Sequence, residues 1–470
     1  MAIRVIAPQA AGKKFKRQGG VQIKSVHITN YYHKSSGGIS TSYNALMAAA
    51  GRHRREIRLI VPGERELVEE VNEYAKIYYV PAPKSFLFDK RYRVILPWKY
   101  ILGGSVIRNI LKKEMPDMIE ITDKYTLSMF GAMISRGLFK QLNRPMLVHF
   151  SCERMDDNIA SFLSKGRLGL RFARAVVGHY LMPSFDFHIA NSPYTAEEFT
   201  QSVKKEFKPS RSLWLLNKTW RAFRSPRIPI EERIFVCPRG VDADLFFPDR
   251  QSDSVRKTMI ERAGVPEDSV ILLYAGRISP EKNIGLLVDL MKILSKDEAK
   301  DYRLLVAGDG PQADWLREKT RESFPGKLVL LGHLDKETLA DYYANADIFV
   351  HPNPKEPFGI APLEAMASGV PTVVPNAGGL LFYATEKNTW LVEPTGSDFA
   401  AAICEIVDNP DLRREKIANA LVAVSENTRI KSTDFLLETY DRLYEDFQNR
   451  RELFTDEEAS KAFDFKIFSS

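Results

Sequence analysis

The sequence lacks the features of membrane-spanning and disulfide-linked proteins. Within its 470 residues, no apolar run approaches the ~18 consecutive residues that a membrane-crossing helix requires. The three cysteines, Cys152, Cys237 and Cys404, are odd in number and far apart, which is typical of reduced thiols rather than a disulfide framework. Residues 1–9 contain neither a signal-peptide core nor a cleavage site. We therefore expect a cytoplasmic protein.

The sequence also lacks the charge pattern of a nucleic-acid-binding protein. Residues 1–20 carry five basic groups and no acid, and residues 201–230 carry eight basic groups and one acid. These two segments together hold +12, whereas the whole chain holds +7, so the rest of the chain is mildly acidic. A protein that wraps nucleic acid spreads basic charge over one face of a domain. We expect no nucleic-acid partner, and we interpret residues 1–20 as a basic flexible tail.

Short apolar runs alternate with helical stretches along the chain, and this pattern occurs twice. Strands alternating with helices predict parallel, doubly wound sheets, so the predicted fold class is α/β with two Rossmann-like domains. Ligands bind such sheets at the carboxyl ends of the strands. The predicted strands cover residues 21–30, 57–61, 75–80, 118–121, 146–150 and 187–190, then 269–275, 303–307, 328–331, 348–351 and 372–375.

Four segments follow from this pattern. The predicted N-terminal domain covers residues 21–240 and the C-terminal domain residues 241–430, after the basic tail at 1–20. The last segment, residues 431–470, contains an amphipathic helix at about 432–448 whose aromatic face needs a partner, followed by a polar tail.

The segment at residues 345–379 has the most chemically informative pattern. A predicted strand ends at Val350, a loop carrying Glu356 follows, and Pro362 is expected to open a helix with Glu364 in its first turn. Two carboxylates beside a helix N-terminus suit a sugar phosphate, because backbone N–H groups bind phosphate oxygens and carboxylates bind hydroxyls. Taken alone, the pair could equally be a helix-start acid and a solvated loop acid.

A second segment, residues 273–287, supplies two cations. Arg277 and Lys282 follow a predicted strand that ends in Gly276, and they precede a predicted helix. Two cations in such a loop suit a diphosphate whose negative charge grows as it leaves. Taken alone, they would be ordinary solvated charges.

Together, these segments resemble the donor-binding half of retaining glycosyltransferase family 4, which has the GT-B fold. The matching segments are AGRISPEKNI, LLVAGDGP, VLLGHLDKETLADYYANADIFVHP and EPFGIAPLEAMASGVPTVVPNAGG. The resemblance is strong over residues 230–395 and weaker over residues 21–230, where GGISTSYNAL, LVHFS and NSPYTAEEF match in position and character. The segment PRGVDADLFFP resembles most the branch of the family that makes glycolipids. The resemblance implies two facing Rossmann-like domains with a C-terminal helix that returns to the first.

The resemblance also implies a role for each charged residue. Glu356 is expected to contact the donor sugar near the reacting carbon, and Glu364 to hold the ribose hydroxyls. Arg277 and Lys282 are expected to neutralise the diphosphate, so no metal or other cofactor is required. The implied activity is transfer of a hexosyl group from a nucleoside diphosphate sugar to an acceptor hydroxyl, with retention.

Further positions carry implied roles in binding the donor. His149, at the end of a predicted strand over residues 146–149, is expected to face the donor sugar. Gly37 and Gly38 are expected to let the backbone approach the phosphates. Three neighbouring residues are expected to supply backbone N–H groups: Phe358, Gly359 and Ile360.

Departures from the family pattern and open alternatives remain. The chain reads Leu380-Leu381-Phe382 where many members have an acid, and 388–390 replaces a common Asn-Gly turn, so the donor stays open. Front-face attack and double displacement through an enzyme nucleophile both stay open as mechanisms. The pattern Asp242-Ala243-Asp244 mimics a metal motif of another glycosyltransferase fold, but it lies in the predicted linker, and we interpret it as coincidence.

Two rival functions come from other classes. Gly308-Asp309-Gly310 with Ala313 matches a dinucleotide fingerprint and would indicate a nucleotide-dependent oxidoreductase, although Pro311 removes one N–H from that loop. A non-catalytic sugar-nucleotide-binding protein is the other rival. The presence of both carboxylates and both cations argues against that second reading.

The basic segment at residues 201–230 has two interpretations. Its basic groups are interleaved with Trp214, Leu215, Leu216, Trp220 and Phe223, a composition that can lie on an anionic membrane. Alternatively, the aromatic residues pack on the first domain and the charges stay solvated. The first interpretation favours a lipid-linked acceptor and a peripheral membrane protein.

Overall fold

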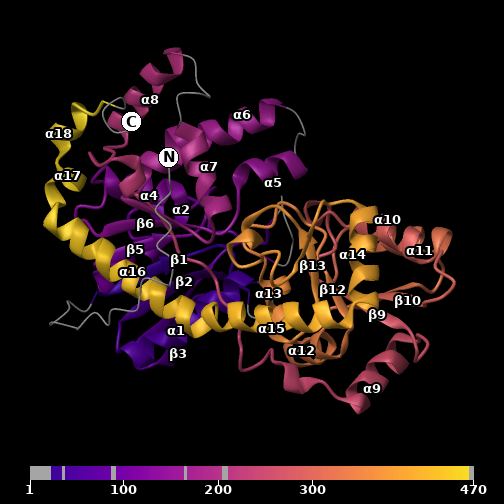
Figure 1. The fold of residues 1–470 in the computed structure, drawn as a ribbon. Helices are drawn as coiled ribbons and strands as arrows, with labels where there is room; N and C mark the ends of the chain where they lie inside the picture. Colours follow the sequence, from indigo (N-terminus) through magenta and orange to yellow (C-terminus); the bar gives the residue numbers. More distant parts are fainter. Residues whose placement is uncertain (1–22, 34–37, 86–91, 163–166, 204–209, 465–470) are drawn as a thin grey trace. The chain divides into compact units, whose positions relative to one another are not determined.

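The computed structural model describes the chain except residues 1–22, 34–37, 86–91, 163–166, 204–209 and 465–470, so the predicted basic tail lies outside it. The chain divides into two compact units (Figure 1). Unit 1 comprises Met1–Pro238 and Ser432–Ser470, and unit 2 comprises Arg239–Lys431. Each unit is built around its own sheet.

Unit 1 contains an eight-stranded sheet with the order β3-β4-β2-β1-β5-β6-β7-β8. Every neighbouring pair is parallel except β3 and β4. Every residue of β1, β2, β5, β6 and β7 is buried, as expected for parallel strands covered on both faces. The strands are β1 Ser25–Ile28, β2 Ile57–Gly63, β3 Leu67–Asn72, β4 Ala75–Pro81, β5 Met118–Ile121, β6 Met146–Ser151, β7 Phe187–Ala190 and β8 Ile234–Val236.

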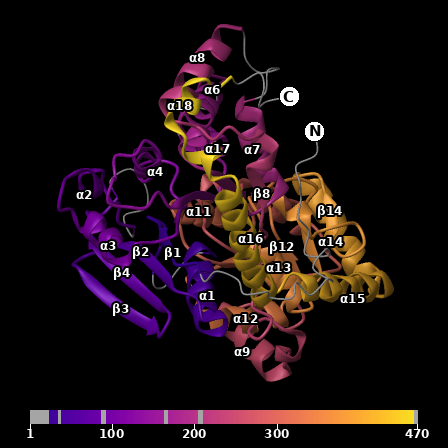
Figure 2. The same ribbon diagram turned by 90° about the vertical axis from the view of Figure 1, so that its left-hand side faces the viewer.

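The sequence patterns did not predict two strands of this sheet. Figure 2 shows β3 at one edge, where it pairs antiparallel with β4 and is mostly exposed. Its sequence, LVEEVN, has no continuous apolar run, which is the pattern that predicts a buried strand. At the other edge, β8 has only three residues.

Helices flank the strands of unit 1, and the C-terminal helices belong to it. These elements are α1 Gly38–His53, α2 Trp98–Ile101, α3 Val106–Glu114, α4 Ser128–Ser135, α5 Met155–Phe162, α6 Arg167–Val176, α7 Pro193–Val203, α8 Ser210–Ala222, α16 Arg429–Asn449, α17 Arg451–Thr455 and α18 Glu457–Lys461.

The long helix α16 returns to the first unit, as the resemblance implied. It begins in unit 2 and belongs to unit 1 from Ser432 onward. Its apolar side chains join those of α1 and of the β-strands in one buried cluster. A polar contact lies within this cluster: buried Glu120 of β5 accepts hydrogen bonds from Tyr440 of α16 and Tyr43 of α1, and it contacts His27 of β1.

Unit 2 contains a six-stranded sheet with the order β11-β10-β9-β12-β13-β14, parallel throughout. The strand order reverses between β9 and β12, and ligands bind open α/β sheets at such a reversal. Buried apolar clusters that include strand and helix residues build the core of this unit. The two predicted Rossmann-like domains are thus confirmed as two α/β units.

Five strands of unit 2 overlap the predicted ones, and the sixth, β14, was not predicted. The strands are β9 Val270–Ala275, β10 Tyr302–Ala307, β11 Leu328–Gly332, β12 Ile348–Val350, β13 Thr372–Pro375 and β14 Trp390–Val392. The helices are α9 Asp253–Ala263, α10 Gly285–Leu294, α11 Ala313–Ser323, α12 Lys336–Asn345, α13 Ile360–Ala367, α14 Gly396–Asp408 and α15 Pro410–Glu426.

Candidate functional site

The loop that carries Glu356 lies between β12 and α13, and glycines fix its path. Gly359 has a φ of +85°, and a Cβ atom there would lie 2.7 Å from the hydroxyl oxygen of Tyr383. Gly378 has a φ of +82°, and its Cβ atom would lie 3.1 Å from the carbonyl oxygen of Glu356. The N–H of Gly379 donates to that same carbonyl at 2.7 Å. The loop therefore has little freedom, because larger residues would clash at both glycines.

The carboxylate of Glu356 is surrounded by donors. Its Oε2 atom lies 2.7 Å from Nζ of Lys282 and accepts a 3.0 Å hydrogen bond from the side-chain amide of Asn353. Nε2 of His351 lies 3.3 Å from the same oxygen. Burial alone would raise the pKa of Glu356, but the charge of Lys282 and the contacts from His351 and Lys282 hold this pKa well below its usual range. Glu356 is therefore ionised at neutral pH.

Glu364 lies in a different environment. Burial raises the pKa of Glu364 to about 7, and the hydroxyl of Tyr343 in α12 donates to its carboxylate at 3.2 Å. The expectation that Glu364 lies in the first turn of its helix is wrong, because α13 begins at Ile360 and Glu364 is its fifth residue. Pro362 does not open the helix but lies inside the first turn. Proline is tolerated there because first-turn N–H groups have no intrahelical partner.

The loop with the two predicted cations follows β9, the neighbour of β12 in the sheet. The hydroxyl of Tyr274 donates to the carbonyl oxygen of Arg277 at 2.9 Å and so orients the start of the loop. Lys282 ends a short 3₁₀ turn, and Asn283 then adopts a left-handed conformation with a φ of +54°. The amide of Asn283 donates to the carbonyl oxygen of Pro352 at 2.9 Å, so it ties this loop to the Glu356 loop.

The glycines of the dinucleotide-like fingerprint have a packing explanation. A Cβ atom on Gly308 would lie 1.9 Å from the carbonyl oxygen of Gly276, and one on Gly310 would lie 2.3 Å from that of Ile278. The loops after β9 and β10 thus approach each other more closely than any side chain allows. This contact accounts for both glycines without a bound cofactor.

Unit 2 therefore brings several predicted residues to one edge of its sheet. Glu356 and Lys282 are in direct contact, and Arg277 lies in the same loop as Lys282. Phe358, Gly359 and Ile360 lead into α13, whose first N–H groups have no partner within the helix.

The structure corrects the placement of His149. Strand β6 continues to Ser151, so His149 lies inside the strand and not at its end. Its ring is fully buried, with ring centroids 5.4 Å from Phe185, 5.6 Å from His188 and 5.8 Å from Phe199. Burial holds the pKa of His149 well below its usual value, so the imidazole is neutral. The predicted contact of His149 with a donor sugar stays a prediction.

The predicted phosphate loop of unit 1 is described only in part. Gly37 lies outside the described residues, and Gly38 is the exposed first residue of α1. The hydroxyl of Ser42 donates to the carbonyl oxygen of Gly38 at 2.8 Å. The predicted role of both glycines stays a prediction.

Sequence reasoning missed a buried ion pair at the carboxyl edge of the unit 1 sheet. Lys124, after β5, pairs with Glu198 of α7 at 2.5 Å, and both side chains are 1% exposed. The other carboxylate oxygen of Glu198 accepts the backbone N–H groups of Met155 at 2.6 Å and Asp156 at 3.1 Å. The only available signal was an acid inside NSPYTAEEF, and the partner lies 74 residues away along the chain.

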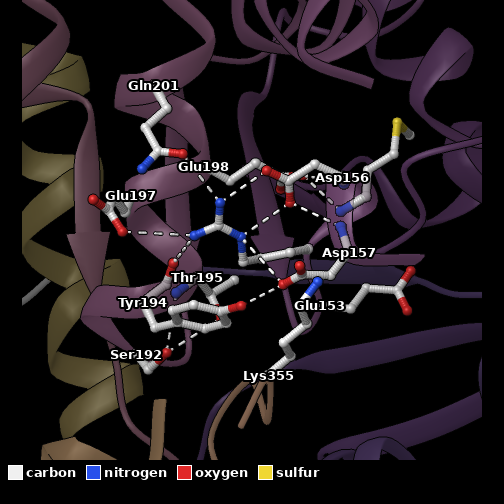
Figure 3. A network of polar contacts seen from close by, with 12 residues as sticks. Glu153, Asp156, Asp157, Ser192, Tyr194, Thr195, Glu197, Glu198, Gln201 and Lys355 are labelled. Carbon is white, nitrogen blue, oxygen red and sulfur yellow. Dashed lines mark hydrogen bonds and ion pairs between the residues drawn. The ribbon is translucent and has the colours of Figure 1, made fainter. Parts of the chain in front are cut away.

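A second charged network lies beside Glu198, and Figure 3 shows Glu198 together with Asp156, Tyr194 and Gln201 of this network. The guanidinium of Arg154 binds both carboxylate oxygens of Asp156, at 3.0 and 2.8 Å. It also donates to the carbonyl oxygen of Tyr194 at 2.9 Å and to the side chain of Gln201 at 3.1 Å. These contacts fix the loop after β6 against α7.

Metal-binding and membrane-spanning features were sought in the described part of the chain. Within it, no three or more His, Cys, Asp or Glu side chains are grouped so that they could hold a metal ion. Asp242 of the metal-like motif forms a 2.5 Å ion pair with Arg429. Among the same residues, no helix has the length and apolar character to cross a bilayer.

The known proteins to which this chain is similar are glycosyltransferases. Residues 255–421 match the model of the family "Glycosyl transferases group 1". The chain is 26% identical over 398 residues to a GDP-mannose-dependent alpha-(1-6)-phosphatidylinositol dimannoside mannosyltransferase of Mycobacterium tuberculosis, covering 84% of this chain and 91% of the relative. It is 23% identical over 417 residues to an alpha-monoglucosyldiacylglycerol synthase of Streptococcus pneumoniae, covering 87% of this chain and 85% of the relative.

Solved structures show the same fold. A sucrose-phosphate synthase from Thermosynechococcus elongatus superposes with a TM-score of 0.67 at 19% identity, covering 90% of this chain and 99% of the other. Anabaena HepE in complex with UDP and glucose superposes with a TM-score of 0.61 at 16% identity, covering 89% of this chain and 100% of the other. Both similarities concern the fold.

Proposed function

We propose that this chain, a glycosyltransferase of the GT-B fold, moves a hexosyl group from a nucleoside diphosphate sugar to an acceptor hydroxyl with retention. Its residues 255–421 match the group 1 family. The observation that carries this proposal is the contact of Glu356 with Lys282 at the strand-order reversal of unit 2. The carboxylate of Glu356, proposed to bind the sugar, and the ammonium of Lys282, proposed to bind the diphosphate, lie 2.7 Å apart.

The donor's diphosphate is assigned to the cationic loop and the helix start. Arg277 and Lys282 would pair with its oxygens, and the first N–H groups of α13 would donate to it. Glu364, whose pKa is raised to about 7, would accept hydrogen bonds from the ribose hydroxyls. Because these groups already supply positive charge where negative charge develops, the reaction is proposed to need no metal ion.

The ionised state of Glu356 narrows its role. A carboxylate with a lowered pKa is a poor proton donor, so Glu356 would act by accepting hydrogen bonds from sugar hydroxyls and by stabilising positive charge near the reacting carbon. In the front-face mechanism, the bond from the anomeric carbon to the diphosphate oxygen breaks. The acceptor oxygen bonds the same face, and its proton passes to that diphosphate oxygen. Double displacement through an enzyme nucleophile is the alternative mechanism.

Substitution of Glu356 tests this function. Glu356→Gln keeps the shape and removes the charge, so we expect turnover to be lost while the protein still binds the nucleoside diphosphate. The donor can be found by thermal stabilisation, since a ligand at ~100 times its Kd adds ~2.7 kcal/mol. Transfer by Glu356→Gln at the wild-type rate in single-turnover assays would overturn the assignment.

The acceptor is proposed to be a lipid-linked hydroxyl. Two relatives carry names that state phosphatidylinositol dimannoside and diacylglycerol chemistry. In this chain, α8 has two faces: Leu216 and Trp220 are buried, whereas Trp214 is 66% exposed and Leu215 is also exposed. The ammonium of Lys218 lies 5.2 Å from the centre of the Trp214 ring. The buried residues agree with the interpretation that aromatic side chains of this segment pack on the first domain, and membrane binding by the exposed ones is proposed.

Helix α6 offers a second exposed apolar face. Leu168, 78% exposed, and Phe172 lie four positions apart and so share one side of the helix. Arg171 beside them is also exposed. Aromatic and aliphatic side chains next to basic groups suit an anionic lipid surface. We assign this face, with Trp214 and Leu215 of α8, to peripheral binding at the cytoplasmic side of a membrane.

Vesicle binding tests the acceptor proposal. The wild type should co-sediment with phosphatidylglycerol-containing vesicles at low salt and be released by high salt. The double variant Phe172→Ser and Trp214→Ser should bind these vesicles more weakly. Trp98→Ser, which removes an exposed tryptophan from α2, is the matched control and should bind as the wild type does. Equal loss in the control, or no binding by the wild type, would favour a soluble acceptor.

A further inference from the structure

Two residues beside Glu356, His351 and Asn353, have no assigned role. Both lie in the loop that follows strand β12, and both are 3% exposed. The side-chain oxygen of Asn353 accepts the N–H of Lys355 at 3.0 Å, which fixes the direction of its amide. Its nitrogen therefore points at Glu356, to which it donates at 3.0 Å.

Three groups converge on a single oxygen atom. Oε2 of Glu356 is 2.7 Å from Lys282, 3.0 Å from Asn353 and 3.3 Å from His351. Asn353 and His351 lie on the short loop after β12. The backbone N–H of His351 donates to the carbonyl oxygen of Val373 in the neighbouring strand β13 at 3.0 Å, so the backbone there is fixed. Lys282 differs, because its ammonium sits on a flexible four-carbon stem and is 26% exposed.

The donor changes this balance. Under the proposed function, the ammonium of Lys282 is also the partner of the diphosphate, which carries more negative charge than Glu356. When Lys282 turns to the diphosphate, the carboxylate of Glu356, only 12% exposed, loses its strongest partner. A poorly solvated carboxylate without donors would shift its position or take up a proton.

We propose that Asn353 and His351 are positioning residues that hold the ionised carboxylate of Glu356 in place when the donor diphosphate draws Lys282 away. In the empty site, Lys282 and Glu356 compensate each other. In the occupied site, the hydrogen bond from Asn353 remains, and the buried Nε2 atom of His351, which has no hydrogen-bond partner among the described residues in the empty site, lies 3.3 Å from the carboxylate and can turn to it. This inference rests on the proposed function, because it requires the diphosphate to bind at Lys282.

Kinetics of single variants test the inference. Asn353→Ala should lower kcat by roughly 10- to 100-fold, the factor of one hydrogen bond to a charged group. His351→Phe should lower kcat by a smaller factor, because the ring forms no hydrogen bond to a described residue in the empty site. In both variants the Kd of UDP or GDP, whichever the wild type binds, should stay unchanged. The acid limb of the kcat–pH profile should move to higher pH, because lost donors favour the protonated carboxyl. Asn353→Gln and His351→Gln keep a donor and should recover part of kcat.

A matched control separates positioning from folding. Asn388 is another buried asparagine of unit 2, and its amide bonds the backbone of Tyr383 and Thr385. Asn388→Ala should lower the melting temperature without moving the acid limb. If Asn353→Ala and His351→Phe leave the acid limb and kcat as in the wild type, or move them no more than Asn388→Ala does, the inference is wrong. The proposed function fails separately, when Glu356→Gln retains full turnover.

Discussion

The carboxyl edges of the two sheets use charge in different ways. In unit 1, Lys124 and Glu198 are each 1% exposed, and Glu198 is further bound by two backbone N–H groups. In unit 2, Lys282 and Glu356 form a similar short ion pair but are 26% and 12% exposed. The first pair is closed and fixes loops, whereas the second remains reachable by a ligand. A short ion pair at a sheet edge therefore indicates a binding site only when some of its charge stays accessible.

The largest expected effect comes from breaking the closed pair. Lys124→Met leaves the buried carboxylate of Glu198 unpaired, and we expect a loss of ~3–5 kcal/mol in the free energy of unfolding. The double variant with Glu198→Gln should be more stable than the single one, because its amide oxygen still accepts the two N–H groups. Urea unfolding of the three proteins measures this. A single variant as stable as the wild type would show that the pair does not fix the fold.

The accessible pair should respond in activity instead. Arg277→Ala and Lys282→Ala should each cost ~2.7–4 kcal/mol of transition-state stabilisation, on the scale of one lost oxyanion donor. Their urea midpoints should fall less than that of Lys124→Met, because Asn353 still donates to the carboxylate of Glu356 when Lys282 is removed. The comparison of kcat/KM with unfolding free energy in each variant measures the contrast. A large loss of stability with intact kcat/KM would mean that the Lys282–Glu356 pair stabilises the fold, as the Lys124–Glu198 pair does, and does not bind a ligand.

The contributions of Glu364 and Glu356 to the free energy of unfolding should change with pH in opposite directions. The pKa of Glu364 is raised to about 7, so its folded state binds the proton more tightly than the unfolded state does. Its contribution to stability is present below the unfolded pKa of ~4.3 and is lost as pH rises toward 7. Glu356, whose pKa is lowered, contributes above ~4.3, and that stability is lost as pH falls toward its folded pKa.

Unfolding at several pH values measures the Glu364 contribution. Between pH 4.5 and 7, we expect Glu364→Gln to remove about 1–3 kcal/mol of the pH-dependent loss, given partial solvent access to this side chain. The pH dependence of Glu356→Gln over the same window should stay close to that of the wild type. Identical curves for the wild type and Glu364→Gln would mean that Glu364 is not held protonated by burial.

The sequence predicts contiguous features well and long-range ones poorly. The segments around Glu356 and Lys282 are each continuous, so their strand, loop and helix order could be predicted, and the fold class with them. The contact between those two residues spans 74 positions and was not predicted, since the resemblance implied only that both residues bind the donor. The enclosure of His149 by Phe185 and Phe199 depends on packing between β6, the residues just before β7, and α7, which no local pattern encodes. Accessibility is a property of the assembled unit.

The smallest expected effect concerns the metal-like motif, whose ion pair is more exposed than the Lys124–Glu198 pair. Asp242 and Arg429 form a 2.5 Å ion pair in which both side chains are partly exposed, 31% and 21%. Exposed pairs of this kind contribute ~0.2–1 kcal/mol, because water and side-chain entropy offset most of the attraction. Asp242→Asn should therefore lower the free energy of unfolding by no more than this amount and leave kcat unchanged. Addition of EDTA should likewise leave turnover of the wild type unchanged. Strict dependence on Mg²⁺ or Mn²⁺, abolished by Asp242→Asn, would instead give this pair the accessible, ligand-binding role assigned to Lys282 and Glu356.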